Sequence, residues 1–297
     1  MRSSGSLTLR RATTHELRRA TTHEEKVTTA GGQYSDSRCH SWGDVLDVHD
    51  GGVIMNECTV CRGKKFIPAT LRPDQEACRN NVPDELPYQV CQRCGLWIQF
   101  PPPPFQYEAD DEVDKRKESM LREQGHYKWL ANRLYNSYKP NSVLDIGSSY
   151  PMLLDFLKNK HGVEDVCGID GCNKTLEYAA ELNVPVIHGN FMEHDFGDKK
   201  FDLVTMVHVI EHFHDPLPAV MKLKKHLNPG GIVFIRTPLN DTEGLTRWHL
   251  TKFHFSVHPI IFSQRSLKML FQTAGFEVAL EAVGDAIGHG DYEFRSR

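Results

Sequence analysis

The amino-acid sequence predicts an α/β protein that has a parallel, doubly wound sheet, with a small cysteine-rich module before it. Three observations lead to this prediction. From residue 143 onward, short apolar runs alternate with helical stretches, which is the pattern of a parallel sheet covered by helices. Two Cys-x-x-Cys pairs occur between residues 53 and 100. Four consecutive prolines at 101–104 then form a stiff spacer.

The bulk composition limits the classes of protein to which the chain can belong. Its 297 residues suffice for one large domain and a small one. A formal net charge of -4 argues against a chain built as a whole to lie on nucleic acid. No apolar run approaches the roughly 20 residues of a membrane span, and no secretory signal follows the first basic residues. We therefore expect a cytoplasmic protein with no membrane partner.

Residues 1–50 are expected to form a disordered extension. The hexapeptide RATTHE occurs at 11–16 and again at 19–24, and the segment is rich in Thr, Arg, Ser and His. With few large apolar residues, it cannot bury enough surface to offset the entropy of ordering the chain. An organelle presequence is the alternative, but the acidic residues of the segment count against it.

The rest of the chain divides into three parts. Residues 53–100 are expected to form the cysteine-rich module, 101–118 a Pro-rich and charged linker, and 119–290 the sheet domain. The charged residues 108–118 are expected to begin one solvated helix that continues through Leu134. Beyond it, the apolar patterns predict strands at 143–146, 166–169, 184–187, 201–209, 231–235 and 276–283, and helices at 152–160, 174–182, 217–227 and 267–273.

The two cysteine pairs have the spacing of a metal site. Cys58 and Cys61 form one pair, Cys91 and Cys94 form the other, and 29 residues separate the pairs. Two such pairs complete a tetrahedral, four-thiolate zinc site, which leaves no open position for catalysis and therefore predicts a structural zinc ribbon. Unrelated buried cysteines, or a ribbon that has lost its metal, are the alternatives. The remaining cysteines have no partner spacing and are expected to be small buried hydrophobes: Cys39, Cys78, Cys167 and Cys172.

The stretch VLDIGSSYP, at 143–151, begins like a nucleotide-binding strand and turn. It supplies an apolar run, an acid at Asp145 and a first glycine at Gly147. Where a glycine-rich loop would have further glycines, this chain has Ser149 and Pro151. Proline is favoured in the first turn of a helix, so Pro151 does not prevent the next helix from starting there. Ser148 and Ser149 are small, and their hydroxyl groups can replace contacts that the missing glycines would allow.

The next two strands end in residues suited to a nucleotide-like cofactor. Asp170 ends the second strand, 25 residues after Asp145, where a carboxylate can accept both hydroxyl groups of a ribose. Asn190 and Phe191 follow the third strand, where an amide and an aromatic ring could bracket an adenine. Together with Asp145, these residues predict a cofactor site beyond the carboxyl ends of the strands.

The order of the motifs resembles that of a known enzyme family. The strings VLDIG, GID, HGNF, FDLVTMVHVIEHFHDP, LNPGG, TPLN, HPIIFS and AGFEV occur in the order and spacing of class I S-adenosylmethionine-dependent methyltransferases, over about residues 55–285. The chain most resembles the ubiquinone-biosynthesis-like, small-molecule branch, here preceded by a zinc-ribbon module with four cysteines. The string EHFHDP at 211–216, followed by LNPGG, is the specific part of the resemblance. The loop GSSYP departs from the usual GxGxG, which puts cofactor affinity in question.

The resemblance implies a Rossmann-like, seven-stranded sheet and assigns roles to positions along it. Its cofactor-binding positions contact, in turn, the methionine end, the ribose, the adenine and the sulfonium region of the cofactor. In this sequence they are Asp145, Gly147 and Ser148, then Asp170, then Asn190 and Phe191, and finally His208, which would act largely through its backbone.

Several histidines are candidates for the acceptor side of the site. A hydroxyl or carbon acceptor needs a base, and histidine suits this role because its ordinary pKa lies near neutral pH. We rank His258 and His212 first and His208 next, while Glu211 and His212 would alternatively only fix the loop. A second hypothesis is that His208, Glu211 and His212 bind a divalent metal such as zinc. Trp248, Phe253 and Phe255 would form an aromatic acceptor lid or pack as an insertion.

The sequence therefore predicts an S-adenosylmethionine-dependent methyltransferase with a structural zinc ion. A small molecule is the expected acceptor, such as a sugar, a glycan or a natural-product intermediate, by family resemblance alone. A nucleic-acid methyltransferase that uses the ribbon as a reader is one alternative, although residues 53–100 carry no basic stripe. A non-catalytic module of the same fold is another. The acceptor atom and the oligomeric state are not predicted.

Overall fold

The structure is a computed structural model that describes residues 46–49, 52–71, 85–102, 110–241, 258–283 and 289–296. All of these residues belong to one unit, Gly43–Arg297. Of the predicted extension, only Leu46–His49 is described, and it forms strand β1. Among the described residues, no helix is both long and apolar enough to cross a membrane.

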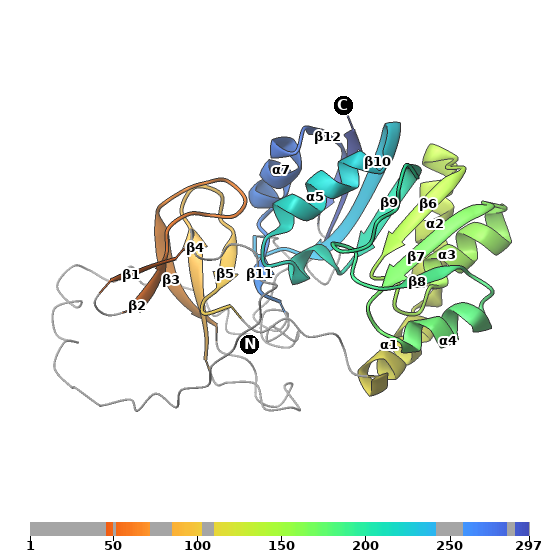
Figure 1. Ribbon diagram of the computed structural model, residues 1–297, viewed down its shortest axis with the longest axis horizontal. Coiled ribbons are helices and arrows are strands. Elements are labelled where there is room, and N and C mark those ends of the chain that lie inside the picture. The colour runs from red at the N-terminus through yellow and green to blue at the C-terminus, as the bar shows by residue number, and fades with distance from the viewer. Residues whose placement is uncertain are drawn as a thin grey trace, which may run out of the picture. The chain divides into compact units, whose positions relative to one another are not determined.

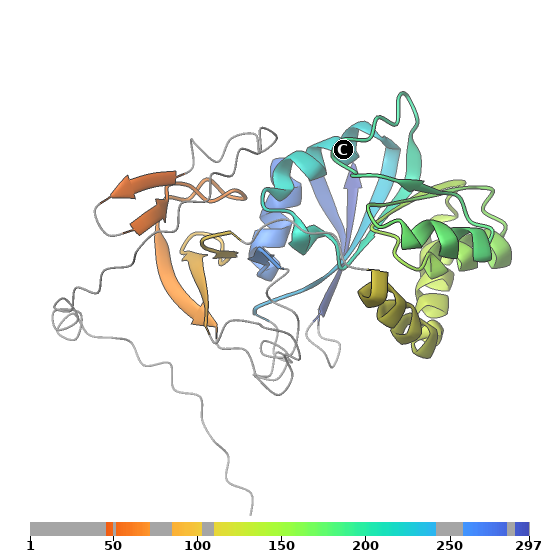
Figure 2. The ribbon, with the colours of Figure 1, turned by 60° about the horizontal axis from the view of Figure 1, so that its bottom comes forward.

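A seven-stranded sheet is the largest of the three sheets among the described residues (Figure 1). Its strands lie in the order β12-β13-β10-β9-β6-β7-β8, and all pair in parallel except β13, which is antiparallel to both of its neighbours. Figure 2 shows the twist of this sheet from a second direction. The strands are β6 (Ser142–Ile146), β7 (Asp165–Asp170), β8 (Val186–His188), β9 (Phe201–Val207), β10 (Leu227–Pro238), β12 (Phe276–Val283) and β13 (His289–Ser296). The predicted doubly wound, Rossmann-like fold is confirmed.

Helices cover both faces of the sheet because its strands are apolar on both sides. In β6, Val143 packs in the same cluster as Leu130 of α2, whereas Leu144 packs in the cluster that contains Val220 of α5 and Leu270 of α7. Successive side chains of a strand point to opposite faces, so one short apolar run packs against the helices on both faces of the sheet. The helices are α1 (Asp110–Arg122), α2 (Gln124–Tyr138), α3 (Met152–Asp155), α4 (Lys174–Glu181), α5 (Pro216–Lys225) and α7 (Gln264–Thr273).

A second, antiparallel sheet carries the cysteine pairs. Its order is β11-β5-β4-β3, with strands β3 (Phe66–Leu71), β4 (Leu86–Cys91), β5 (Trp97–Gln99) and β11 (Ile260–Ile261). A separate hairpin pairs β1 (Leu46–His49) with β2 (Gly52–Met55). Strand β11 follows far behind the other three in the chain and lies beside β5 (Figure 1). The cysteine-rich sheet therefore includes a strand from the sequence that follows β10.

Three of the predicted elements are interrupted or end early in the structure. The single helix expected through Leu134 is two helices, because Glu123 leaves the helical conformation at φ -98° and ψ 15°. The strand expected at 201–209 ends at Val207, since His208 is left-handed at φ 57°. The helix expected at 152–160 is α-helical only to Asp155 and continues as a π-helical turn, Phe156–Lys160.

A further strand was missed. The run at 276–283 is not the last strand of the sheet, because β13 follows it and lies between β12 and β10. Strand β13 extends beyond residue 290, at which the domain was expected to end.

Candidate active site and cysteine cluster

The four paired cysteines form one buried cluster. Cys58 Sγ lies 3.7 Å from Cys94 Sγ, and Cys61 Sγ lies 3.5 Å from Cys91 Sγ. Four sulfurs at about 2.3 Å from a central zinc would be about 3.8 Å apart, which matches these distances. All four sulfurs lie within 4.8 Å of one another, and none is in a disulfide. The donor set and its spacing therefore fit a tetrahedral zinc ion.

The two other described cysteines lie outside this cluster. Cys167 and Cys172 are both buried and both pack in hydrophobic clusters, as predicted for small apolar side chains. Cys39 and Cys78 lie outside the described residues.

A cavity of about 530 Å³ opens beyond the carboxyl ends of β6, β7, β8 and β9. Its wall is made by the loops after these strands and by one face of α1 and the start of α2. This is the edge at which parallel sheets of this kind bind ligands. The predicted residues that line it are Asp145, Gly147, Ser148, Asp170, Asn190, Phe191, His208 and His212.

The turn after β6 depends on a glycine. Gly147 is left-handed at φ 67°, and a Cβ built on it would lie 2.5 Å from Cγ2 of Val209. Only glycine tolerates both the conformation and the contact. Ser148 Oγ donates a hydrogen bond of 2.9 Å to the carbonyl oxygen of Asp145 and is buried against Gly168, where a Cβ would lie 2.4 Å from that Oγ. Ser148 therefore supports the turn from within.

Asp170 joins the loops that follow β6 and β7. Its Oδ2 accepts a hydrogen bond of 2.8 Å from the main-chain amide of Ser149, and its Oδ1 accepts one of 2.9 Å from the amide of Cys172. Ser149 is left-handed at φ 47°, so this serine takes a conformation more often given to glycine. Its Oγ is buried with no hydrogen-bond partner among the described residues. That hydroxyl group is a polar atom at the cavity that a ligand would satisfy.

Asp145 is buried at the base of the cavity. Its Oδ1 accepts a hydrogen bond of 2.6 Å from Thr205 Oγ1 on the neighbouring strand. Burial, with a smaller contribution from the nearby charge of Asp170, raises the pKa of this carboxyl to about 7, and the bond from Thr205 opposes the shift. A cationic or hydrogen-donating ligand group beside Asp145 would favour its ionised form.

Asn190 and Phe191 form the wall that follows β8. Asn190 Oδ1 accepts a hydrogen bond of 2.8 Å from the amide of Met192, and Phe191 is buried. Lys222 Nζ donates to the carbonyl oxygen of Met192 at 3.0 Å and lies 5.2 Å from the centre of the Phe191 ring. The loop is therefore held in place by α5, with an aromatic ring and an amide at the cavity.

Histidines gather around a buried glutamate beside the cavity, just after β9. His208 Nδ1 lies 3.4 Å from Glu211 Oε1, and Thr237 Oγ1 donates to Glu211 Oε2 at 3.0 Å. Burial would raise the pKa of Glu211, but the hydrogen bond and charge of His208, with a smaller contribution from His212, lower it to about 2, so the glutamate is an anion at neutral pH. The rings of His212 and His258 meet edge to face, with centroids 4.7 Å apart.

The predicted histidines do not all reach the cavity in the same way. His208 and His212 line it, and Pro259 lines it beside them. His258 is buried and reaches the site through its contact with His212. Burial lowers the pKa of His258 to about 3, and the neighbouring His212 lowers it too, so this ring is neutral. The predicted lid residues Trp248, Phe253 and Phe255 lie outside the described residues.

The hypothesis of a divalent metal site was framed on His208, Glu211 and His212, and the structure groups His258 with the last two in place of His208. Ligand atoms of Glu211, His212 and His258 lie within 4.8 Å of one another, whereas His208 is not in that group. The donor types suit zinc or a similar ion.

Several residues at the cavity were not predicted, and two of them are polar side chains from the helices before β6. Arg116 of α1 and Tyr127 of α2 line it, next to Val113 and Met120. Asp170 and Glu211 are among the charges that act on the guanidinium group of Arg116. Residues 113, 116 and 120 recur on one face of a helix, and this spacing was the signal available in the sequence.

Comparisons with known proteins identify the family and the fold of the sheet domain. Residues 121–281 match a family model described as a methyltransferase domain. The demethylmenaquinone methyltransferase of Staphylococcus aureus strain JH9 is 36% identical over 74 residues, which are 23% of this chain and 31% of the relative. The chain thus matches about a third of the length of that relative.

Two solved structures share the fold. An O-methyltransferase family protein from Burkholderia thailandensis superposes with a TM-score of 0.51 at 13% identity, over 62% of this chain and 59% of that one. A SAM-dependent methyltransferase from Thermotoga maritima gives a TM-score of 0.50 at 17% identity, over 63% of this chain and 97% of that one.

Proposed function

Because this chain belongs to the methyltransferase-domain family, whose class I members use S-adenosylmethionine, we propose that it transfers a methyl group from that cofactor to a small-molecule acceptor. The observation that carries the proposal is the position of Asp170. Its carboxylate ends β7 at the cavity and is fixed there by two main-chain amides, beside the Gly147 turn. This is the place from which an acid accepts the hydroxyl groups of a ribose.

The residues of the cavity fit the parts of the proposed cofactor. Asp170 would bind the ribose, and Asn190 and Phe191 would flank the adenine. The Gly147 turn and Ser148 would lie along the methionine end, where Asp145 accepts from the amino group and Arg116 pairs with the carboxylate. The unsatisfied Ser149 Oγ would gain a partner. The main-chain carbonyl of left-handed His208 is the group proposed nearest to the sulfonium.

The bound cofactor supplies an electrophilic methyl carbon and its own leaving group. What remains for the protein is to align an acceptor in line with that carbon and to exclude water, and alignment accounts for much of the rate. His212 lines the cavity and lies beside anionic Glu211, so we propose that it accepts a proton from the acceptor. His258 would hold the ring of His212, and the cysteine cluster would bind a structural zinc ion.

The proposal is tested by titrating zinc-loaded protein with S-adenosylmethionine in a calorimeter, alongside an Asp170→Ala variant. Asp165→Ala is the matched control, because Asp165 begins the same strand and pairs at the surface with Lys199. We expect micromolar binding to the parent and to Asp165→Ala, and a loss of at least roughly tenfold in Asp170→Ala. Absence of binding to the parent would refute the enzyme proposal and favour a module that kept only the fold.

A further inference from the structure

The second cysteine pair is hydrogen-bonded directly to the sheet domain. Ser263 Oγ donates a bond of 2.6 Å to the carbonyl oxygen of Cys94. Asn240 Nδ2 donates at 3.0 Å to the carbonyl oxygen of Gly95 and at 3.2 Å to that of Ile261. Gly95 is left-handed at φ 78°, and a Cβ there would lie 3.1 Å from Ser263 Oγ. The metal-binding turn therefore closes tightly on Ser263, and a side chain at Gly95 would be strained.

The strands of the cysteine-rich sheet hold the residues just before Ser263. Ile260 and Ile261 pair with Ile98 and Trp97 of β5. The main-chain amide of Gln99 donates a bond of 2.8 Å to the carbonyl oxygen of Pro259. Tyr88 OH, on β4, donates to the carbonyl oxygen of His258 at 3.4 Å. The backbone from 258 to 261 is thus fixed by the cysteine-rich sheet, and Phe262 next to it pairs with Leu239 and Asn240, just after β10.

The other end of this segment is the histidine cluster of the cavity. The His258 ring meets His212 edge to face and lies among the charged groups around Glu211. His258 is 9% exposed, although it follows directly on a segment outside the described residues. Its burial therefore depends on what holds residues 259–263.

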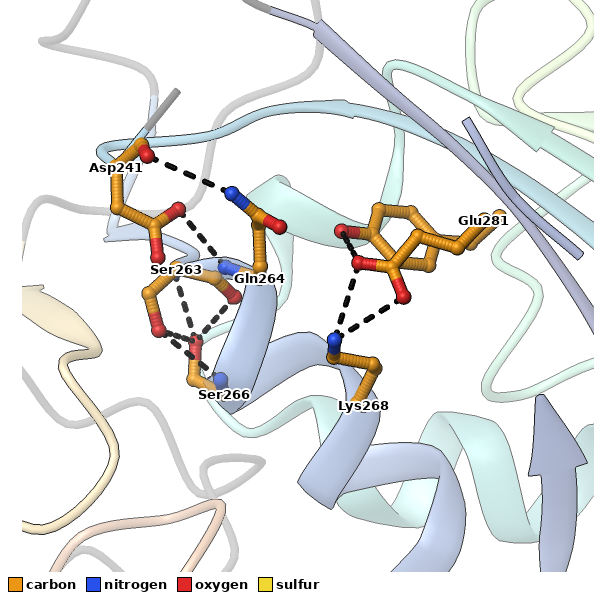
Figure 3. Close-up of polar contacts among 7 residues, drawn as sticks. Asp241, Ser263, Gln264, Ser266, Lys268 and Glu281 are labelled. Atoms are coloured by element: carbon orange, nitrogen blue, oxygen red, sulfur yellow. Dashed lines mark hydrogen bonds and ion pairs between the residues drawn. The ribbon is translucent and has the colours of Figure 1, made fainter. Parts of the chain in front are cut away.

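Ser263 also begins α7. Figure 3 shows its Oγ beside Ser266; this Oγ accepts from the amide of Ser266 at 3.0 Å, while Ser266 Oγ accepts from the amide of Ser263 at 2.8 Å. Asp241 Oδ1 accepts from the amide of Gln264 at 3.0 Å in the same view. The hydroxyl of Ser263 therefore joins the helix start to the metal-binding turn, whereas the hydroxyl of Ser266 serves the helix alone.

We propose that the cysteine ribbon positions the acceptor side of the cavity, with Ser263 and strand β5 as the positioning elements and His258 as the residue they hold. This inference rests on the proposed function for the meaning of the cavity. A metal-loaded second turn presents the carbonyls of Cys94 and Gly95 to Ser263 and Asn240. Loss of the metal releases those carbonyls, and His258 then leaves its place against His212. The cofactor half of the cavity, built on β6 and β7, stays intact.

The first experiment measures the exposure of single histidines. Diethyl pyrocarbonate modifies exposed, neutral imidazole rings, and peptide mass spectrometry reports each one. His226 is the matched control, because it is also 9% exposed and its Nδ1 is hydrogen-bonded to the carbonyl oxygen of Lys199, away from the ribbon. We expect His258 to be protected in zinc-loaded protein and to react roughly tenfold faster after chelation, while His226 is unchanged.

The second experiment keeps the metal and removes one contact. Ser263→Ala loses both the helix cap and the bond to Cys94, whereas Ser266→Ala weakens the same cap and leaves the bond to Cys94. We expect faster modification of His258 in Ser263→Ala alone, with full zinc content in both variants. Equal protection of His258 in the parent, the chelated protein and Ser263→Ala would overturn the proposal. Equal deprotection in the two serine variants would assign the effect to the cap and would also overturn it.

Calorimetry separates this inference from the proposed function. S-adenosylhomocysteine, the demethylated cofactor, is the probe. We expect it to bind Ser263→Ala within about twofold of the parent, because the variant leaves β6 and β7 unaltered. A parent that binds no S-adenosylhomocysteine but loses His258 protection on chelation would refute the enzyme and keep the coupling. A parent that binds the probe, but in which chelation leaves the protection of His258 unchanged, would support the enzyme and refute the coupling.

Discussion

The main-chain amide of Ser149 donates a 2.8 Å hydrogen bond to Oδ2 of Asp170. This bond links the loop after β6, which departs from the usual glycine pattern, to the acid proposed to bind the ribose. Ser149 makes the contact in a left-handed conformation. The departure from a glycine-rich loop therefore leaves the acid oriented at the cavity.

Gly147→Ala should be strongly destabilising. The new Cβ would lie 2.5 Å from Val209 in a residue at φ 67°. Gly162→Ala is the matched control, since Gly162 has φ 72° and nothing within 4 Å of a Cβ. We expect a loss of about 1 kcal/mol in the control from backbone strain and about 2–4 kcal/mol in Gly147→Ala, where the clash is added. Urea unfolding measures both, and equal losses would show that Val209 moves aside without cost.

Asp145→Asn should stabilise the protein at neutral pH. The folded state raises the pKa of Asp145 to about 7, above its value of about 3.9 in an unfolded chain. The folded state then holds a proton that the unfolded chain releases, so stability falls as pH rises from about 4 to 7. The variant has no such loss. Its free energy of unfolding should exceed that of the parent by on the order of 3 kcal/mol at about pH 8, and the difference should vanish near pH 4. Thermal unfolding across this pH range measures it.

Asp202→Asn should have the opposite effect. Burial would raise the pKa of Asp202, but bonds from Asn228 Nδ2 and from the amides of Asn141 and Ser142 lower it. Its stabilisation is present above about pH 4 and is lost as pH falls through the lowered pKa. The variant should lose about 1–3 kcal/mol at neutral pH, and less at about pH 3. A loss that did not shrink at low pH would contradict this assignment.

Arg116→Gln should weaken cofactor binding without weakening the fold. Its guanidinium group lines the cavity near Asp170 and Glu211, where a cofactor carboxylate would complete the charge balance. Arg122→Gln is the control, because Arg122 ends the same helix and pairs only loosely, at 3.9 Å, with Glu118 at the surface. We expect roughly tenfold weaker binding of S-adenosylhomocysteine in Arg116→Gln. Unchanged affinity in calorimetry would assign Arg116 to the acceptor or to the helix surface.

Cobalt should report four thiolates in the cysteine cluster. Metal-free protein that is refilled with Co²⁺ should show the intense visible absorption of a tetrahedral thiolate site, which one equivalent of Zn²⁺ then removes. Cys58→Ser should weaken metal retention and alter the spectrum. Cys167→Ser, a change of a buried cysteine outside the cluster, should do neither.

The features that could be predicted from the sequence are those that depend on residues close together in the chain. The alternation of short apolar runs with helical stretches predicted the sheet, the acid at the tip of β7 predicted the cavity edge, and the spacing of the cysteine pairs predicted the cluster. The contact of His212 with His258 and the placement of Arg116 depend on packing between segments far apart in the chain. Such contacts leave no periodic pattern in the sequence. The sequence could therefore give a ranking of the histidines and the spacing of one helix face, but not which side chains meet.

Strand β13 was missed for a different reason. It carries Asp291 and Glu293, acids that a pattern assigns to an exposed loop, yet both are buried. Arg236 Nε lies 2.6 Å from Asp291, and Arg133 Nη1 lies 2.6 Å from Glu293. Buried charges persist when partners compensate them. Those partners come from β10 and α2, so the strand could not be recognised from its own residues.

The place of β13 also constrains how the chain matures during synthesis. Residues 289–296 insert between two strands that are made earlier, β10 and β12. Until they leave the ribosome, each of those strands presents an unpaired edge open to association with other chains. In a nascent chain stalled before residue 289, β12 would therefore have no strand through which to join the sheet at β10. Strand β12 and helix α7 could take their places only after β13 is made.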